Sequence, residues 1–201
     1  ARCFRGIDDE YANTLAKAAI KAWRWLEKQT TPPDDEVSWG DIHFGLHVAP
    51  RPPQSTSIYK CWAAAEICAM DQSITSAKDY VDNLYPNNWA GVKIYPLAPH
   101  LFVVYTYCQT PGATSKTVEN MRKCMEELVK DILERKTGYE FSLDERDWTW
   151  GSNHAICRYG LALLFAARLG AIGSYSVEEV YAQALAQLNY IHGLNPMQMV
   201  Y

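Results

Sequence analysis

Apolar residues recur at intervals of three and four along most of this chain, which is the spacing of amphipathic helices. The stripe is clearest over residues 115–136, where its members are Val118, Met121, Met125, Leu128, Ile132 and Leu133. A second stripe begins near Asp8, and its members are Tyr11, Leu15, Ala18, Ala22 and Leu26. Acidic residues at its start suit a helix N-terminus. The pattern therefore predicts a long helix over each segment.

Further segments carry helix signals, and no two segments pair convincingly as strands. Helices are expected over residues 58–70, 75–84 and 153–169. A last helix begins with the capping box of Ser176 and Glu179. Its inner face is expected to hold Val180, Ala184, Leu188 and Ile191.

Residues 97–107 are almost all apolar and leave two interpretations open. Val103, Val104 and Tyr105 would suit a strand, but a buried helix agrees better with the neighbouring segments. With that helix the chain has about seven, so the predicted class is all-α, with helix hairpins stacked side by side.

Two of the expected helices are apolar on nearly every side. Residues 62–69 and 159–167 carry small residues on faces that would be polar in a simple bundle. A helix of this kind has neighbours on several sides. An inner ring of helices covered by an outer ring supplies such neighbours, so the pattern favours a concentric helical barrel over a bundle.

Composition narrows the function classes. The chain has 201 residues, 48% hydrophobic and 12% aromatic, with a net charge of −4. The acidic balance argues against a dedicated nucleic-acid-binding protein. No apolar run approaches the roughly 18 to 20 residues of a membrane span. We therefore expect one soluble domain without nucleic-acid or membrane partners, and its seven Trp and thirteen Tyr indicate a large core or a surface for flat ligands.

The Cys and His residues indicate neither a disulfide framework nor a metal site. There is no CxxC pair among the six Cys, and Cys61, Cys68, Cys124 and Cys157 lie in apolar helical patterns, where a thiol behaves as a small buried hydrophobe. The five His are scattered singly, whereas a metal site needs three or four converging ligands. We expect reduced thiols and no bound metal.

Residues 144–154 carry the densest chemical cluster of the chain. The cluster combines Asp144, Glu145 and Asp147 with Trp148 and Trp150. Paired carboxyl groups beside aromatic rings suit a cleft that cleaves sugars. The other interpretation, which we favour for the carboxylates, is a solvated acidic loop before a helix. For Trp150 both interpretations stay open.

Four blocks of sequence resemble glycoside hydrolase family 9 cellulases. Residues 181–196 (YAQALAQLNYIHGLNP) resemble the family's QLNYILGxNP helix and turn, and residues 150–153 match its WGSN helix start. Residues 61–67 (CWAAAEI) resemble its YWAAAELY helix, and residues 7–26 its DPxYxxxxLxxAxxAWxWL helix. The four blocks follow the family's order and span nearly the whole chain.

The resemblance implies an (α/α)6 barrel and inverting hydrolysis of β-1,4-glucan by a carboxylate base and a carboxylic acid. In the family the base lies in a DAGD motif before the position of Asp8, and the acid follows Asn195-Pro196. Neither motif occurs in residues 1–201. We therefore expect a partial catalytic domain that holds no catalytic residue, does not cleave cellulose alone and associates or aggregates when isolated.

The resemblance also places four side chains at the glucan. It matches Trp150 and Trp89 to aromatic platforms of the cleft and Trp62 to a Trp near it, although a buried Trp62 is an equal alternative. His154 occupies a position where relatives often carry an Arg that contacts the glucan. The implied protein is a secreted endo-β-1,4-glucanase, with bound calcium left open.

Two other functions remain compatible with the sequence. One is a non-catalytic helical module that binds cello-oligosaccharide through the aromatic side chains. The other is a different all-α toroid enzyme that acts on sugars, such as an epimerase or an exo-glucosaminidase.

Overall fold

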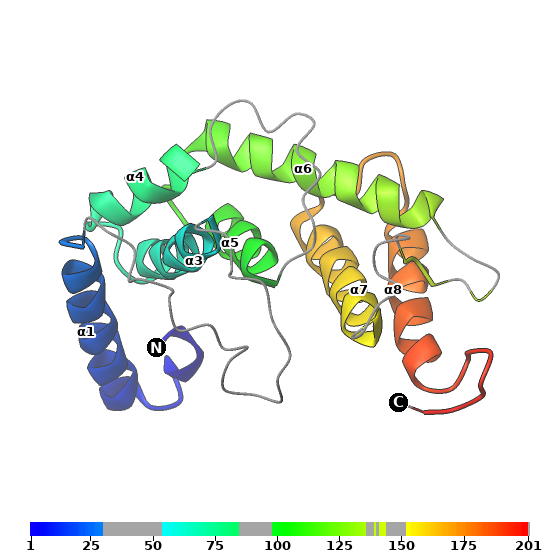
Figure 1. Ribbon diagram of the computed structural model, residues 1–201. Coiled ribbons are helices and arrows are strands. Elements are labelled where there is room, and N and C mark those ends of the chain that lie inside the picture. Colours follow the sequence, from blue (N-terminus) through cyan, green and yellow to red (C-terminus); the bar gives the residue numbers. More distant parts are fainter. Residues whose placement is uncertain (30–53, 85–97, 136–138, 140, 144–151, 201) are drawn as a thin grey trace. The chain divides into compact units, whose positions relative to one another are not determined.

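The computed structural model describes residues 1–29, 54–84, 98–135, 139, 141–143 and 152–200. Within them lie a short 3-10 helix and seven α-helices (Figure 1): η1 (Arg2–Phe4), α1 (Asp9–Leu26), α3 (Gln54–Met70), α4 (Thr75–Leu84), α5 (Ala98–Cys108), α6 (Ser115–Glu134), α7 (Ser152–Leu169) and α8 (Val177–Ile191).

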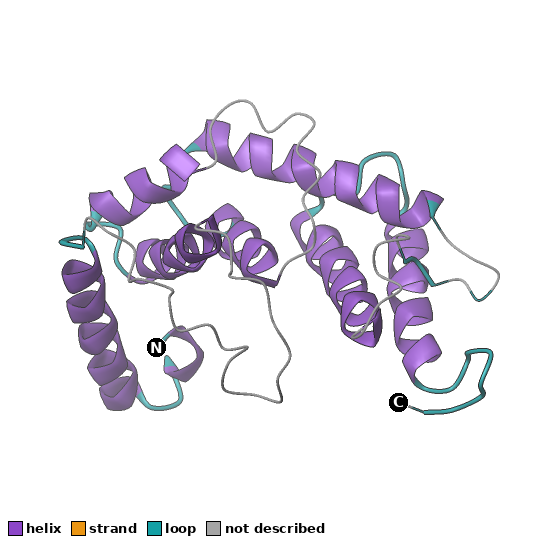
Figure 2. Cartoon of the chain, viewed as in Figure 1, coloured by secondary structure: helices purple, strands orange, loops and turns teal. Residues whose placement is uncertain are grey.

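Helices account for nearly all of the regular structure in these ranges, as Figure 2 shows. The one extended pairing found there is an isolated bridge between His192 and Val200. The predicted all-α class is thereby confirmed, and the succession of helices agrees with the predicted part of an (α/α)6 toroid. No helix in the described ranges has the length and apolar character needed to cross a membrane.

The chain forms two compact units, residues 1–84 and 85–201, which are described separately. In the first unit, α1 contacts α3, and α3 pairs with α4. The Asp8 side chain caps α1 by accepting a hydrogen bond from the backbone N–H of Tyr11. At the other end, Lys60 Nζ of α3 donates to the carbonyl of Leu26 at 3.3 Å, which ties α3 to the last turn of α1.

The buried face of α1 differs from the predicted stripe. Ala12 and Trp23 are buried, whereas Tyr11 is 47% exposed and Ala18 and Ala22 are exposed. The prediction was wrong by one position, or about 100° around the helix. The reason is Trp23: its indole lies edge-on to Tyr80 of α4 at 6.1 Å, so its large apolar surface decides which face turns inward.

Helix α3 carries six buried residues spread around its axis: Ile58, Cys61, Ala64, Ala65, Ile67 and Cys68. Burial raises the pKa of the Cys61 thiol and, with a smaller contribution from Asp82, the pKa of Cys68 to about 11. Both thiols are therefore protonated at neutral pH and behave as hydrophobic groups. Tyr59 and Ala63 are exposed, so α3 also keeps an open side.

In the second unit, α7 contacts α5, α6 and α8, and α6 crosses the α7–α8 hairpin (Figure 1). Neighbours on three sides explain why the apolar segment 159–167 needs small residues. At Gly160 an added Cβ would lie 3.4 Å from Cβ of Gln187, so this glycine permits close packing of α7 on α8. Residues 98–108 form helix α5, which confirms the helical interpretation of that segment.

The predicted stripe of α6 is largely confirmed. Four of its six members are buried: Met121, Met125, Leu128 and Ile132. All six Cys are free thiols in the structure. Cys157 is exposed on α7, however, so its prediction as a buried hydrophobe was wrong.

His100 makes the stability of the second unit dependent on pH. Burial lowers its pKa to about 4, so the ring is neutral in the folded protein between pH 4 and 6.5 but protonated in the unfolded chain. The unfolded state then binds more protons, and the free energy of unfolding falls as the pH drops from about 6.5 toward 4. We expect a loss of about 1–2 kcal/mol, allowing for partial solvent contact.

Chemical denaturation at several pH values checks this expectation. His100→Gln is expected to flatten the pH dependence, while His154→Gln, at an exposed position, serves as the matched control. An unchanged slope in the His100 variant would contradict it.

Candidate functional site

Two of the four predicted glucan-binding residues lie within the described ranges, and two lie outside them. Trp150 and Trp89 lie outside the described residues, as do Asp144, Glu145 and Asp147. Trp62 is half-buried on α3 of the first unit, and His154 is exposed in the first turn of α7 in the second. The structure therefore describes two of the four, one in each unit.

On α7, His154 lies one turn before an apolar groove between α7 and α8. The groove has a volume of about 540 Å³ and is lined by Cys157, Gly160, Leu161, Leu164, Tyr181, Ala184, Leu185, Gln187 and Leu188. Its lining offers almost no polar group to a sugar hydroxyl. The groove is thus a hydrophobic contact surface and lacks the convergent polar groups of a sugar site.

A buried polar network anchors the residues that lead into segment 144–151. The backbone N–H of Ser142 donates to Oε1 of Gln187 at 3.1 Å, and Ser142 Oγ donates to the carbonyl of Ile132 at 2.8 Å. Gln183 Nε2 donates to Ser142 Oγ at 3.1 Å. The network joins residue 142 to α6 and α8, two residues before the segment that carries Trp150.

This network corrects the predicted inner face of α8. Gln183 and Gln187 are buried, while Leu188, expected to face inward, is 49% exposed. The face is turned because buried polar groups of Ser142 need hydrogen-bond partners: Gln187 accepts from its backbone N–H, and Gln183 donates to its hydroxyl oxygen. Two Gln spaced four apart beside the apolar stripe were the signal in the sequence that could have revealed this.

Aromatic and cationic groups strengthen the same region. The Phe141 ring lies 4.3 Å from that of Tyr190. Arg135 donates from Nη1 to the Tyr159 hydroxyl at 3.4 Å and pairs with Asp131 at 2.9 Å. The contacts of Arg135 attach the end of α6 to α7. Residues 141 and 142 are held by groups from α6 and α8.

Asn195 of the family-like NP turn has a structural role. It is buried, and its Nδ2 donates to the carbonyls of Tyr190 and Met199 at 2.8 and 2.7 Å. Its Oδ1 accepts from the backbone N–H groups of Met197 and Met199. The side chain uses both its donors and its acceptor, which fixes the turn after α8.

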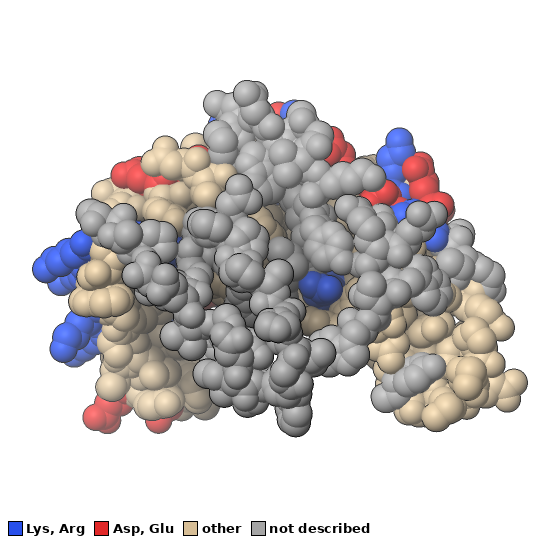
Figure 3. All heavy atoms as spheres, in the orientation of Figure 1, with Lys and Arg blue, Asp and Glu red and all other residues tan. Residues whose placement is uncertain are grey.

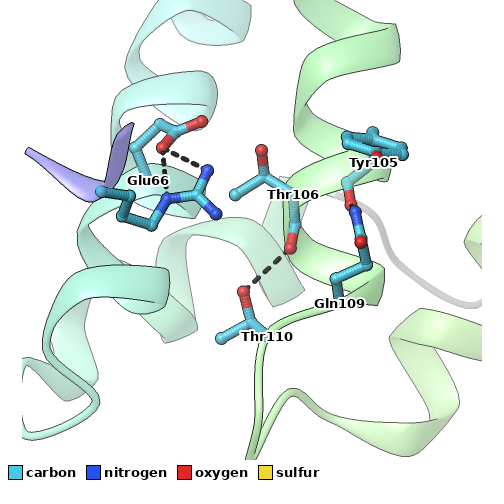
Figure 4. Close-up of polar contacts among 6 residues, drawn as sticks. Glu66, Tyr105, Thr106, Gln109 and Thr110 are labelled. Atoms are coloured by element: carbon cyan, nitrogen blue, oxygen red, sulfur yellow. Dashed lines mark hydrogen bonds and ion pairs between the residues drawn. The ribbon is translucent and has the colours of Figure 1, made fainter. Parts of the chain in front are cut away.

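In the first unit, Glu66 of the WAAAE block is held by an ion pair (Figure 4). Arg2 donates from Nε and Nη2 to Glu66 Oε2 at 3.1 and 2.7 Å. In the second unit, drawn in the same figure, Thr110 Oγ1 donates to the carbonyl of Thr106 at 2.9 Å and closes the end of α5. Both are structural contacts.

Two carboxyl groups of the described ranges have a pKa below the ordinary value. Hydrogen bonds from Ser73 lower the pKa of the Asp71 carboxyl, and the hydrogen bond from Lys123 lowers that of Glu119. A catalytic acid needs the opposite shift. No group of three or more His, Cys, Asp or Glu converges on a metal-sized site within the described part of the chain.

Comparison with known proteins identifies the family. A family model described as glycosyl hydrolase family 9 matches residues 1–201, the whole chain. Searches of curated proteins and of solved structures gave no match. The match agrees with the all-helical fold and with the four sequence blocks. The chain belongs to glycosyl hydrolase family 9.

Proposed function

We propose that the protein hydrolyses β-1,4-glucosidic bonds in cellulose or related β-glucans, acting within the polymer and outside the cell. The observation that carries the proposal is the family model that covers all 201 residues. A glycosyl hydrolase acts on a carbohydrate, and the order of the four sequence blocks supports a glucan as that carbohydrate. The family supports hydrolysis over the epimerase alternative.

The proposed mechanism is an inverting one. One carboxylic acid protonates the glycosidic oxygen that leaves, and a carboxylate on the opposite face of the sugar takes a proton from the attacking water. Both carboxyl groups belong to the DAGD and glutamate motifs that residues 1–201 do not contain. These residues would then supply binding surface rather than the reacting groups.

Binding is assigned to three indoles and one imidazole. Trp150, Trp89 and Trp62 would offer flat apolar faces to glucose rings, and an indole N–H is a possible donor to a sugar hydroxyl. His154 is exposed at the start of α7, where its ring can donate or accept one hydrogen bond.

Titration with cello-oligosaccharides tests the assignment. We expect a change of tryptophan fluorescence on binding and at least a tenfold weaker affinity in Trp150→Ala, because each stacked ring contributes on the order of 1–2 kcal/mol. Trp150→Phe keeps a flat ring and is expected to retain most of the affinity. Equal losses in both variants would contradict stacking at this position.

A hydrolysis assay separates the two candidate functions. Residues 1–201 alone are expected to bind soluble glucan without cleaving it. Cleavage of glucan by the purified 201-residue chain would contradict the proposal that both catalytic carboxyl groups lie outside these residues. If a protein that includes the DAGD and glutamate motifs also fails to cleave glucan, the non-catalytic binding module is favoured. For an active protein, nuclear magnetic resonance of the first product is expected to show the inverted anomer.

A further inference from the structure

One face of α1 carries a row of cations beside an exposed indole. Lys17, Lys21, Arg24 and Lys28 line a shallow hollow of about 520 Å³ together with Ile20 and Trp25. All four cations are exposed, and Trp25 is 63% exposed. Figure 3 shows Lys and Arg side chains gathered over α1. We call these six residues the basic face of α1.

One described carboxylate lies within electrostatic reach of the basic face: after the hydrogen bonds from Ser73, the charge of Arg24 makes a smaller contribution to the lowered pKa of Asp71. None of its four cations lies within ion-pair distance of an acidic group among the residues that the structure places. Helix α6 differs, because its lysines 116, 123 and 130 pair with Glu119 or Glu134. The favourable field at a helix C-terminus acts only over the last turn, so it leaves Lys17 and Lys21 unexplained.

The geometry suits a linear ligand. Lys17 and Lys28 lie about 16 Å apart along the helix axis, at a rise of about 1.5 Å per residue. Lys21 and Arg24 lie between them on the same face, and Trp25 presents its ring beside the row. A chain that carries one negative charge on each successive unit could contact several of these cations at once.

The side chains of the basic face favour one class of anionic ligand over membranes and nucleic acids. A membrane surface requires an apolar helix face to insert, but the apolar face of α1, with Ala12 and Trp23, is already buried in the first unit. Nucleic acid is disfavoured by the net charge of −4. An acidic sugar has a carboxylate that can pair with a cation of the basic face and a ring that can stack on Trp25.

We propose that the basic face of α1 binds an acidic polysaccharide, a polymer of uronate residues. Lys17, Lys21, Arg24 and Lys28 pair with successive carboxylates, and Trp25 stacks on a sugar ring. The proposal goes beyond the cleavage of glucan and does not depend on which glucan is cleaved.

The test compares two triple variants with the same change of charge. Binding of polygalacturonate to the purified protein is measured by calorimetry at low salt. We expect Lys17→Gln/Lys21→Gln/Lys28→Gln to bind about tenfold more weakly, because each exposed ion pair contributes modestly, whereas Lys116→Gln/Lys123→Gln/Lys130→Gln is expected to bind as the unaltered protein does. Circular dichroism checks that both variants keep their helices.

Two further measurements test the role of the sugar ring. Trp25→Ala is expected to weaken polygalacturonate binding severalfold and to leave the weaker binding of polyglutamate unchanged. Raising the salt to physiological strength is expected to reduce binding, because the screening length falls to about 8 Å.

Three results would overturn the proposal. The first is an equal loss of affinity in both triple variants, which would indicate that binding responds to the total charge of the protein and not to the basic face. The second is equal binding of polyglutamate and polygalacturonate, which would remove the role of the sugar ring. The third is binding to anionic phospholipid vesicles without binding to polygalacturonate, which would assign the face to a membrane.

Discussion

Trp23→Ala is expected to lower the free energy of unfolding by about 4 kcal/mol, the range found for large aromatic residues removed from a core. Trp23 is 3% exposed and is the largest side chain buried on α1. Its removal leaves a cavity against Tyr80 and deletes the weak hydrogen bond from Nε1 to Ser76 Oγ at 3.4 Å. Urea denaturation followed by circular dichroism measures the change.

The neighbouring Trp25 supplies a matched control within the same helix turn. Because Trp25 is 63% exposed, Trp25→Ala is expected to change stability by less than about 0.5 kcal/mol. Trp23→Phe keeps most of the packing and is expected to cost about 1 kcal/mol. Similar losses in the two Ala variants would show that the assigned orientation of α1 is wrong.

Gln187→Ala is expected to lower the free energy of unfolding by about 3 kcal/mol, the second largest effect. Gln187 is 1% exposed, and its Oε1 accepts the backbone N–H of Ser142. Removing the amide leaves that N–H buried without its partner, which costs about 1–3 kcal/mol. A cavity opposite Gly160 adds to the loss.

Two variants separate the hydrogen bond from the packing. Gln187→Met keeps the volume but removes the acceptor, so it is expected to lose about 1–3 kcal/mol. Leu188→Ala, at the exposed neighbouring position, is the control and is expected to cost little. If Gln187→Met is as stable as the unaltered protein, the hydrogen bond to Ser142 contributes nothing.

The same network has a predicted consequence for glucan binding. Ser142 precedes segment 144–151, which carries Trp150. If Trp150 binds sugar as proposed, loosening of residue 142 in Gln187→Met reduces affinity for cello-oligosaccharide even in conditions where the protein remains folded. Leu188→Ala is expected to leave that affinity unchanged.

The two exposed surfaces of α1 and of the α7–α8 hairpin differ in chemistry. The basic face of α1 carries charged side chains, which are well hydrated, whereas the α7–α8 groove exposes Tyr181, Leu185 and Leu188. Exposed apolar surface of this kind promotes association. The groove is therefore consistent with the expectation, which stays a prediction, that isolated residues 1–201 associate or aggregate.

Local signals in the sequence predicted most of the helices. The capping box of Ser176 and Glu179 is present as predicted, and Asp8 begins α1. The buried stripe of α6 was predicted from the spacing of its apolar residues alone, at intervals of three and four. Caps and periodicity act within a few residues along the chain, so they are readable without knowledge of the fold.

The faces that α1 and α8 bury could not be predicted in the same way. In α1 the indole of Trp23 decided the orientation because Ser76 and Tyr80 of α4 lie opposite it. In α8, Gln183 and Gln187 are buried in place of Leu188 because Ser142, 45 residues from Gln187, needs partners for its backbone N–H and its hydroxyl. Both outcomes depend on groups that are distant in sequence.

The amino-acid sequence by itself determined the helical class, the N-terminal caps of α1 and α8 and the family, because these rest on short-range spacing and on blocks of consecutive residues. Only the tertiary structure decided which sides of α1 and α8 are buried and that Asn195 and Gln187 are structural. Within the described residues it also shows no ion pair for the cations of the basic face beside Trp25. The burial of a side chain depends on the groups that folding brings to it from distant segments, and a local pattern does not contain those groups.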